Sequence, residues 1–171
     1  YNSASRGGVA AVMGSKHLKA IALRGHGGLT VEYGRAFDDL ALRVRHELAT
    51  DSGTESLYNW GTAGSVPGLN ALGMLAARNF SESSLEGADS LSGQYLEEQG
   101  YLIGRESCFS CSTACHRYMR TLSHRWGKVQ DSGPELETTL SLGTECGIID
   151  PESLLVANQL CSDLGMDTIS A

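Results

Sequence analysis

Three of the five cysteines lie within eight residues, in the run Cys108-Phe-Ser-Cys111-Ser-Thr-Ala-Cys115. Thiolates at this density are typical of a soft-metal site, because each one is a strong ligand. The C-x2-C-x3-C spacing lets one short loop cover a face of a compact centre and supply three of the four thiolates of a cubane cluster. The spacing therefore predicts a [4Fe-4S] cluster on Cys108, Cys111 and Cys115, with a fourth ligand from another segment.

The same cysteines admit three other interpretations. A zinc site would use them together with His116, since tetrahedral zinc accepts three cysteines and one histidine. A disulfide-linked extracellular loop fits less well, because five cysteines in 171 residues is sparse for such a scaffold. Covalent haem attachment needs C-x-x-C-H, and the interval from Cys111 to Cys115-His116 is one residue too long. Cys146 and Cys161 lie in apolar stretches, which favours small core residues over ligands.

Length and charge limit the classes of function. A chain of 171 residues can bury one sizeable core or parts of two. The formal net charge is −7 and no run of five basic residues occurs, so no nucleic-acid surface is expected. No apolar stretch approaches the length of a membrane span and no signal sequence follows Tyr1, which favours a cytoplasmic protein. The start without methionine and the end at Ala171 suggest a piece of a longer polypeptide.

Local patterns in the first half predict strands followed by a helix. Residues 18–24 alternate in part between apolar and polar side chains, which predicts a strand, and residues 29–32 predict a short partner strand. A helix is expected over 34–50, where the apolar side chains form one stripe. That stripe consists of Phe37, Leu40, Ala41, Val44 and Leu48. Residues 51–80 are rich in glycine and asparagine and predict a loop with short helical turns.

Patterns in the second half predict three helices and a short strand. A helix is expected over 88–99, a strand-like segment over 116–122, and another helix opening at Gly133-Pro-Glu-Leu-Glu137, where proline and acids suit a first turn. The last helix is the best defined, with Asp150 as N-cap and Gly165 after its end. Its inward-facing residues are predicted to be Leu154, Leu155, Leu160, Cys161 and Leu164.

Four segments carry a family resemblance. They are Arg6-Gly-Gly-Val-Ala-Ala-Val-Met-Gly-Ser-Lys16, the three-cysteine loop, Gly133-Pro-Glu-Leu-Glu-Thr138 and Gly165-Met-Asp-Thr-Ile-Ser170. In order and spacing they resemble the tungsten-dependent aldehyde:ferredoxin oxidoreductases, whose corresponding motifs include Gly-Pro-Glu-Tyr-Glu-Thr and Gly-Leu-Asp-Thr-Ile-Ser. Weaker similarities lie at Gly61-Thr-Ala-Gly64 and Arg78-Asn-Phe80. Each segment alone is weakly specific, but the four agree along almost the whole chain.

The resemblance implies an α+β fold within a larger three-domain enzyme. Residues 1–32 would form the end of an N-terminal, β-rich, cofactor-binding domain. Residues 33–171 would belong to a mainly helical domain that carries the iron–sulfur loop. The fourth cluster cysteine and a further pterin-binding segment would lie beyond Ala171, so this chain would hold only part of each site.

The resemblance also implies the cofactors. They are a [4Fe-4S] cluster and a tungsten, or molybdenum, bis-pyranopterin, with Mg²⁺ bridging the pterin phosphates as an additional expectation. The implied pterin contacts are Asn2, Ser3, Ser5, Arg6, Ser162, Met166 and Asp167. An arginine beside glycines suits a phosphate, because its guanidinium binds in a bidentate manner and glycine permits close backbone approach. Without the resemblance, Asp167 would be an ordinary turn residue.

Glu137 is the implied catalytic residue. In the family the second acid of this motif lies near the metal, where it would act as general base or acid in a water-excluded pocket. The alternative is that Glu135 and Glu137 only favour the helix dipole, a role that suits Glu135 better. His116 and His124, which are near the cysteine loop in sequence, are expected at the surface or behind the ligands.

The implied reaction is oxidation of an aldehyde to a carboxylic acid, with electrons passed to ferredoxin or an iron–sulfur subunit. Relatives that reduce carboxylic acids or aromatic thioesters are the alternative within the family, and a zinc-stabilised interaction domain is the alternative outside it. A homo- or hetero-oligomer is expected. Ser112, Ala10, His17 and Ser162 depart from the residues usual in the family, so the substrate stays open.

Overall fold

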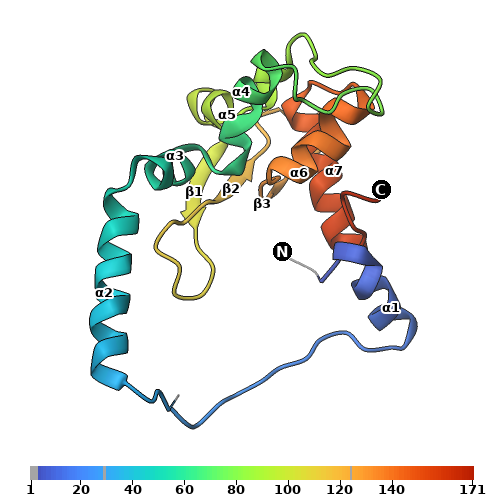
Figure 1. The fold of residues 1–171 in the computed structure, drawn as a ribbon. Helices are drawn as coiled ribbons and strands as arrows, with labels where there is room; N and C mark the ends of the chain where they lie inside the picture. Colours follow the sequence, from blue (N-terminus) through green and yellow to red (C-terminus); the bar gives the residue numbers. More distant parts are fainter. Residues whose placement is uncertain (1–3, 29, 124) are drawn as a thin grey trace.

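The computed structural model describes residues 4–28, 30–123 and 125–171 (Figure 1). The helices are η1 Arg6–Gly8, α1 Val9–Ser15, α2 Gly34–Thr50, α3 Ser52–Trp60, η2 Thr62–Ser65, α4 Val66–Ala71, η3 Ala88–Leu91, α5 Gly93–Glu98, α6 Leu136–Thr138, η4 Thr139–Gly143, η5 Thr144–Cys146 and α7 Pro151–Leu164. The strands are β1 Leu102–Glu106, β2 His116–Arg120 and β3 Gln130–Ser132. Within the described ranges, none of these helices is long and apolar enough to cross a membrane.

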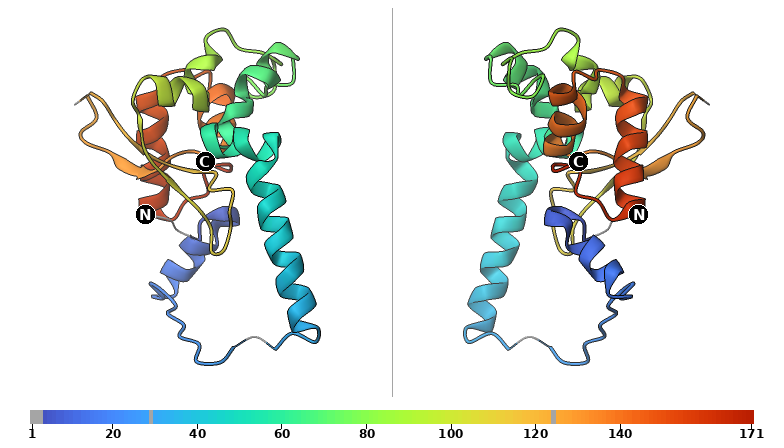
Figure 2. Two further views of the ribbon diagram at one scale, coloured as in Figure 1. Left: turned by 90° about the vertical axis from the view of Figure 1, so that its left-hand side faces the viewer. Right: turned by 90° about the vertical axis from the view of Figure 1, so that its right-hand side faces the viewer.

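The helices α3 to α7 and the small sheet form the main body, as Figures 1 and 2 show. One group of buried residues in this body joins α4, the segment after it and η3, with Leu136 and Leu140 packed against it. Its buried members are Val66, Leu75, Ala77, Leu85 and Ala88. The start of the predicted Gly-Pro-Glu motif helix is therefore held against the core.

The sheet is antiparallel with strand order β1-β2-β3. Met119 on β2 is buried against Leu96 of α5 and Leu155 of α7, which fixes the sheet to the helices. The pair Glu106 and His116 closes the β1–β2 ladder, so the segment between them is the connection of a hairpin. The prediction of a strand at 116–122 is thus confirmed for His116–Arg120, whereas β1 was not predicted.

Helix α7 has the predicted ends. The Asp150 carboxylate accepts a hydrogen bond from the Ser153 N–H at 3.1 Å, and Pro151 is the first residue. Gly165 ends the helix with φ of +68°, a left-handed conformation that favours glycine. Leu154, Leu155 and Cys161 are buried as predicted. The prediction for Leu160 and Leu164 is wrong, because both side chains are exposed and no described segment covers them.

The difference in burial between the two faces of α7 predicts that matched leucine variants differ widely in their free energy of unfolding. Leu154 is 1% exposed and Leu160 is 56% exposed. Leu154→Ala is expected to reduce the free energy of unfolding by about 2–5 kcal/mol, because it leaves a cavity in the core. Leu160→Ala should change it by less than about 0.5 kcal/mol. Equal losses in chemical denaturation of the two variants would contradict this assignment of the faces.

Several other elements differ from the predictions. The helix at 34–50 is confirmed as α2, but the stripe residues Phe37, Leu40, Val44 and Leu48 are exposed and no α2 residue is buried. The strand predicted over 18–24 does not form, because no described segment pairs with it. A strand was also predicted over 29–32; residue 29 lies outside the described residues, and residues 30–32 do not form a strand. The region 51–80 contains the nine-residue helix α3. The helix predicted over 88–99 is divided at Ser92 into η3 and α5.

Two further corrections concern the segment after Gly133. The helix predicted to open there begins only at Leu136, so Pro134 precedes it, and it continues as the π-helical η4 and the 3₁₀ helix η5. Cys146 was predicted as a core residue, but it lies at the end of η5 and is exposed. Its sulfur contacts the Ser141 carbonyl oxygen at 3.2 Å.

Glu152, in the first turn of α7, holds the connection between β2 and β3. Its side chain is buried, and its carboxylate accepts hydrogen bonds from the N–H groups of Leu122 (2.8 Å) and Ser123 (2.5 Å) and from the Ser123 hydroxyl. Burial alone would raise the pKa of this carboxyl, but the bonds from Ser123 and Leu122 lower it below its ordinary value. The ionised form therefore stabilises the folded chain.

The Glu152 contacts predict a pH-dependent effect. Glu152→Gln is expected to reduce the free energy of unfolding by about 1–3 kcal/mol at neutral pH, because a charged acceptor of three hydrogen bonds is lost. The folded pKa lies below the unfolded one, so this contribution is complete above the unfolded pKa and is lost as pH falls through the folded pKa. Denaturation at neutral and at acidic pH measures the difference, which should shrink in acid. A difference that grows in acid would contradict the assignment.

Candidate functional site

The cysteine loop, residues 107–115, is the connection between β1 and β2. Ser110 and Ala114 have φ of +59° and +49°, which is uncommon for residues other than glycine and indicates a tightly turned backbone. The Cys111 N–H donates to the Cys108 carbonyl at 3.0 Å. Cys108, Cys111 and Cys115 are all free thiols.

The loop changes the pKa of two of its thiols in opposite directions. The pKa of Cys111 is lowered, chiefly because the backbone N–H of Thr113 donates to its sulfur and then because the Thr113 hydroxyl does so as well. The pKa of Cys115 is raised, chiefly by burial and then by the negative charge of Glu135. The thiolate form is therefore favoured at Cys111, the middle cysteine of the loop.

The donor set of the loop fits an iron–sulfur group. It offers three thiols on one short segment, and one of them already accepts backbone N–H bonds of the kind found around such clusters. Across residues 4–28, 30–123 and 125–171, no three His, Cys, Asp or Glu side chains lie close enough together to hold a metal ion.

A line of polar contacts leads from the first cysteine into the body. The Cys108 Sγ lies 3.6 Å from the His116 Nε2. The other ring nitrogen, Nδ1, lies 3.4 Å from the Glu135 Oε1. The Thr62 hydroxyl donates to the Glu135 Oε2 at 2.5 Å and accepts the Leu136 N–H at 2.8 Å. His116 thus lies directly behind a predicted ligand, and Glu135 faces the histidine.

Arg117 is a buried cation beside the cysteine loop, with 4% of its surface exposed. Its Nη2 donates to the carbonyl oxygens of Ala114 and Leu57, both at 2.8 Å, and its Nε donates to that of Cys115 at 3.2 Å. Its Nη1 donates to the Asn59 carbonyl at 3.4 Å. Since a buried charge needs partners, these bonds account for its place in the interior.

Arg105 lies opposite Arg117 in the β1–β2 register and binds residues of α3 and α5. Its guanidinium donates to the carbonyls of Tyr58 (3.0 Å) and Asn59 (3.3 Å), pairs with Glu97 at 2.6 Å, and lies 5.2 Å from the centre of the Tyr58 ring. Two arginines therefore bind the last carbonyls of α3, where a helix carries partial negative charge.

The predicted pterin-binding segments meet at Asp167. The Gly7 N–H donates to the Asp167 Oδ2 at 3.0 Å, across 160 residues of sequence, and the Ser170 hydroxyl donates to the same oxygen at 2.9 Å. The pKa of Asp167 is lowered, first by the Gly7 bond and then by the Ser170 bond. The glycine-rich segment and the C-terminal loop are thus one structural unit, as the positions of α1 and α7 in Figure 1 also show.

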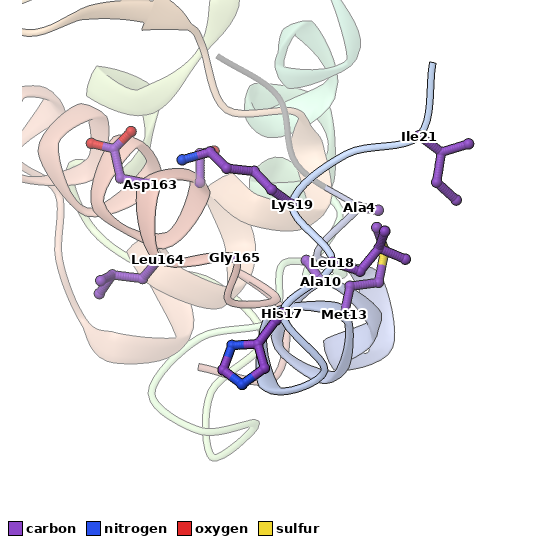
Figure 3. A pocket seen from close by; sticks show the side chains of 12 residues that line it. Ala4, Ala10, Met13, His17, Leu18, Lys19, Ile21, Asp163, Leu164 and Gly165 are labelled. Atoms are coloured by element: carbon purple, nitrogen blue, oxygen red, sulfur yellow. The ribbon is translucent and has the colours of Figure 1, made fainter. Parts of the chain in front are cut away.

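A cavity of about 780 Å³ lies between this N-terminal segment and the end of α7 (Figure 3). Met13 and Leu18 line one side of it, and Lys19 extends toward α7, where Asp163 lies. Ser162 also lines it. Of the predicted pterin contacts in the described residues, Ser162 lines this cavity, whereas Ser5, Arg6, Met166 and Asp167 do not.

Three further predicted pterin contacts, Ser5, Arg6 and Met166, lie in the described residues. Ser5 is partly buried and its carbonyl accepts the Gly8 N–H at 2.7 Å, whereas Arg6 and Met166 are exposed. Asn2 and Ser3 lie outside the described residues, as does His124.

Glu137 lies in the first turn of α6, and its side chain is exposed. The water-excluded pocket expected around it is not formed by the described residues. The neighbouring Thr138 is buried, and its hydroxyl lies 2.7 Å from that of Thr168. This contact joins the Gly-Pro-Glu motif directly to the loop that carries Asp167.

The four segments therefore form one connected arrangement. From the cysteine loop, contacts run through His116 to Glu135, from Thr138 to Thr168, and from Asp167 to Gly7. A family model described as aldehyde ferredoxin oxidoreductase, domains 2 and 3, matches residues 39–171. The chain belongs to the aldehyde ferredoxin oxidoreductase family. The family resemblance predicted from the sequence is confirmed.

Curated proteins match almost the whole chain. It is 37% identical to a tungsten-containing aldehyde ferredoxin oxidoreductase of Pyrococcus abyssi and 36% identical to that of Pyrococcus horikoshii, over 99% of this chain and 27% of each relative. It is 27% identical to the WOR-like subunit of an aliphatic sulfonate oxidoreductase of Pyrococcus furiosus, with the same coverage. The chain thus spans about a quarter of the length of these curated relatives.

Sequence reasoning missed Arg117 and Thr62 as members of the site. Arg117 follows the last cysteine by two residues, and in β2 its side chain shares a face with the buried Met119. The period of two along a strand could have placed it inside. Thr62 lies in Gly61-Thr-Ala-Gly64, which carried only a weak resemblance.

Proposed function

We propose that this chain is part of a tungsten-pterin, iron–sulfur oxidoreductase that oxidises aldehydes to carboxylic acids and passes the electrons to ferredoxin. The observation that supports this most is the connected arrangement of all four motifs, from the cysteine loop to Asp167 and Gly7. Each motif brings a different chemistry, and the contacts hold them next to one another. Residues 1–32 would belong to the first domain of the complete enzyme and residues 33–171 to the helical domain that follows.

The residues of this chain would have distinct roles. Cys108, Cys111 and Cys115 would bind a [4Fe-4S] cluster together with a ligand outside the chain. Arg6, with Mg²⁺, would bind pterin phosphates, and Asp167 would accept hydrogen bonds from pterin N–H groups. The other contacts to the pterin would come from Asn2, Ser3, Ser5, Ser162 and Met166.

Glu137 would move the proton of the reaction. Oxidation of an aldehyde by water gives a carboxylic acid, two protons and two electrons, and the metal–pterin group supplies the two-electron acceptor when bound. A carboxylate can take the proton from the attacking oxygen as general base. Its exposed position in the first turn of α6 leaves Glu137 accessible to a substrate approaching beside the Asp167 loop.

Aldehyde-dependent reduction of ferredoxin by the complete, anaerobically purified polypeptide tests this proposal. We expect the enzyme to be active with an aldehyde as the electron donor. We expect no activity when a carboxylic acid, an aromatic thioester or an aliphatic sulfonate replaces the aldehyde as substrate. A visible spectrum separates the zinc-domain alternative: a broad brown absorption bleached by dithionite is expected of a cluster, whereas a colourless protein with one zinc ion would contradict the proposal.

A further inference from the structure

The turn between α3 and η2 lies against the last cysteine of the loop. Gly61 has φ of +64° and ψ of −167°, and its N–H donates to the Leu57 carbonyl at 2.9 Å. A Cβ atom at this position would lie 2.9 Å from the Cys115 carbonyl oxygen and 2.9 Å from the Arg117 Nε. Glycine is therefore required here both for its backbone angle and for the close approach of the loop.

Arg117 connects the C-terminal end of the loop to α3 by hydrogen bonds. Its guanidinium donates to carbonyls of the loop on one side, at Ala114 and Cys115, and to carbonyls of α3 on the other, at Leu57 and Asn59. A planar guanidinium can make such bonds in several fixed directions, whereas the single ammonium of lysine cannot. The backbone of the third cysteine is thus tied to the end of a helix.

A chain of polar contacts connects the same turn to Cys108, at the opposite end of the loop. Thr62, the residue after Gly61, donates to Glu135, whose other carboxylate oxygen faces His116. His116 in turn contacts the sulfur of Cys108 at 3.6 Å. Three segments distant in sequence meet along this line: η2, the start of α6, and the loop with the adjoining strand β2.

We propose that the Gly61–Thr62 turn fixes the position of both ends of the cysteine loop, and that Arg117, Gly61 and Thr62 are positioning residues for the cluster. Through Arg117 the turn fixes the backbone of Cys115, and through Glu135 and His116 it fixes the sulfur of Cys108. Two of the three ligands are thereby held in place before iron is bound, which lowers the ordering cost of binding. This inference rests on the proposed cluster and extends it to residues that do not touch iron.

The test compares matched variants of the complete polypeptide, by iron content, by loss of iron to a chelator and by the electron paramagnetic resonance spectrum of the reduced cluster. Arg117→Lys is expected to lose iron about tenfold faster than the wild type or more, as removal of an outer-shell partner does at other metal sites. Arg105→Lys is the control, because Arg105 donates to the same helix end, and its hydrogen bonds within the described residues go to α3 and α5 and not to the loop. It should retain iron as the wild type does.

Variants of Thr62 provide the second part of the test. They test the positioning role even if Arg117→Lys does not fold. Thr62→Val removes the hydroxyl and should shift the resonance spectrum and speed the loss of iron, whereas Thr62→Ser keeps the hydroxyl and should restore both. If the wild type contains iron, and Arg117→Lys and Thr62→Val both match it in iron retention and in resonance spectrum, the inference is overturned but the proposed function is not. Wild type without iron would instead overturn the proposed function on which the inference rests.

Discussion

Cys111→Ala in the complete polypeptide is expected to remove the iron–sulfur cluster and the ferredoxin-linked activity. Cys111 is the thiol that the loop already favours as thiolate, through N–H and O–H bonds from Thr113. Loss of an outer-shell partner costs metal sites about 10–100-fold in affinity, and loss of a ligand should exceed that. Iron analysis and the dithionite-bleachable absorption measure the effect.

Cys146→Ala is the matched control for this prediction. Cys146 is also an exposed free thiol, but it lies at the end of η5, outside the loop, where its sulfur donates to the Ser141 carbonyl oxygen. It should bind iron as the wild type does. Full iron content and an unchanged spectrum in Cys111→Ala would show that the loop does not ligate the cluster.

Glu137→Gln is expected to lower kcat by about 10²–10⁴-fold while leaving the metal content unchanged, because the amide cannot accept the proton that a general base must take. Glutamine has the same shape and the Glu137 side chain is exposed, so the fold should persist. Steady-state kinetics with an aldehyde, on enzyme of measured metal content, gives the comparison.

Glu98→Gln controls for the loss of one surface charge, since Glu98 is an exposed carboxylate at the end of α5. It should turn over at the wild-type rate. A Glu137→Gln enzyme that also turns over at the wild-type rate would assign Glu137 to the alternative role, an acid that only favours the N-terminus of α6.

The ends of α7 could be predicted because they are fixed by local chemistry. An N-cap aspartate, a proline at the first position and a left-handed glycine act within one turn of the residue that carries them. The inward face of the same helix was only partly predicted, since Leu160 and Leu164 are apolar yet exposed. Which side of a helix is covered depends on segments distant in sequence.

Strands were the least predictable elements. The sequence Leu102–Glu106 has only two apolar residues, side by side, and becomes a strand because β2 pairs with it. Residues 18–24 have the more strand-like pattern, but no described segment supplies them with a hydrogen-bonding partner. Pairing, rather than propensity, decides these cases.

The site was predicted as separate motifs, and the structure adds the contacts between them. Residue type and spacing indicated the cysteine loop, and resemblance indicated Asp167 and Glu137. The bonds from Gly7 to Asp167 and between Thr138 and Thr168 depend on the tertiary fold, so no local pattern contains them. The same holds for Arg117, whose partners are backbone carbonyls without any sequence signature.

Metal analysis of the complete polypeptide, purified without oxygen, tests the central claim most directly. The account predicts iron in the amount of one four-iron cluster together with tungsten or molybdenum, and loss of the iron in Cys111→Ala. A folded wild-type protein that contains neither iron nor either heavy metal would contradict it.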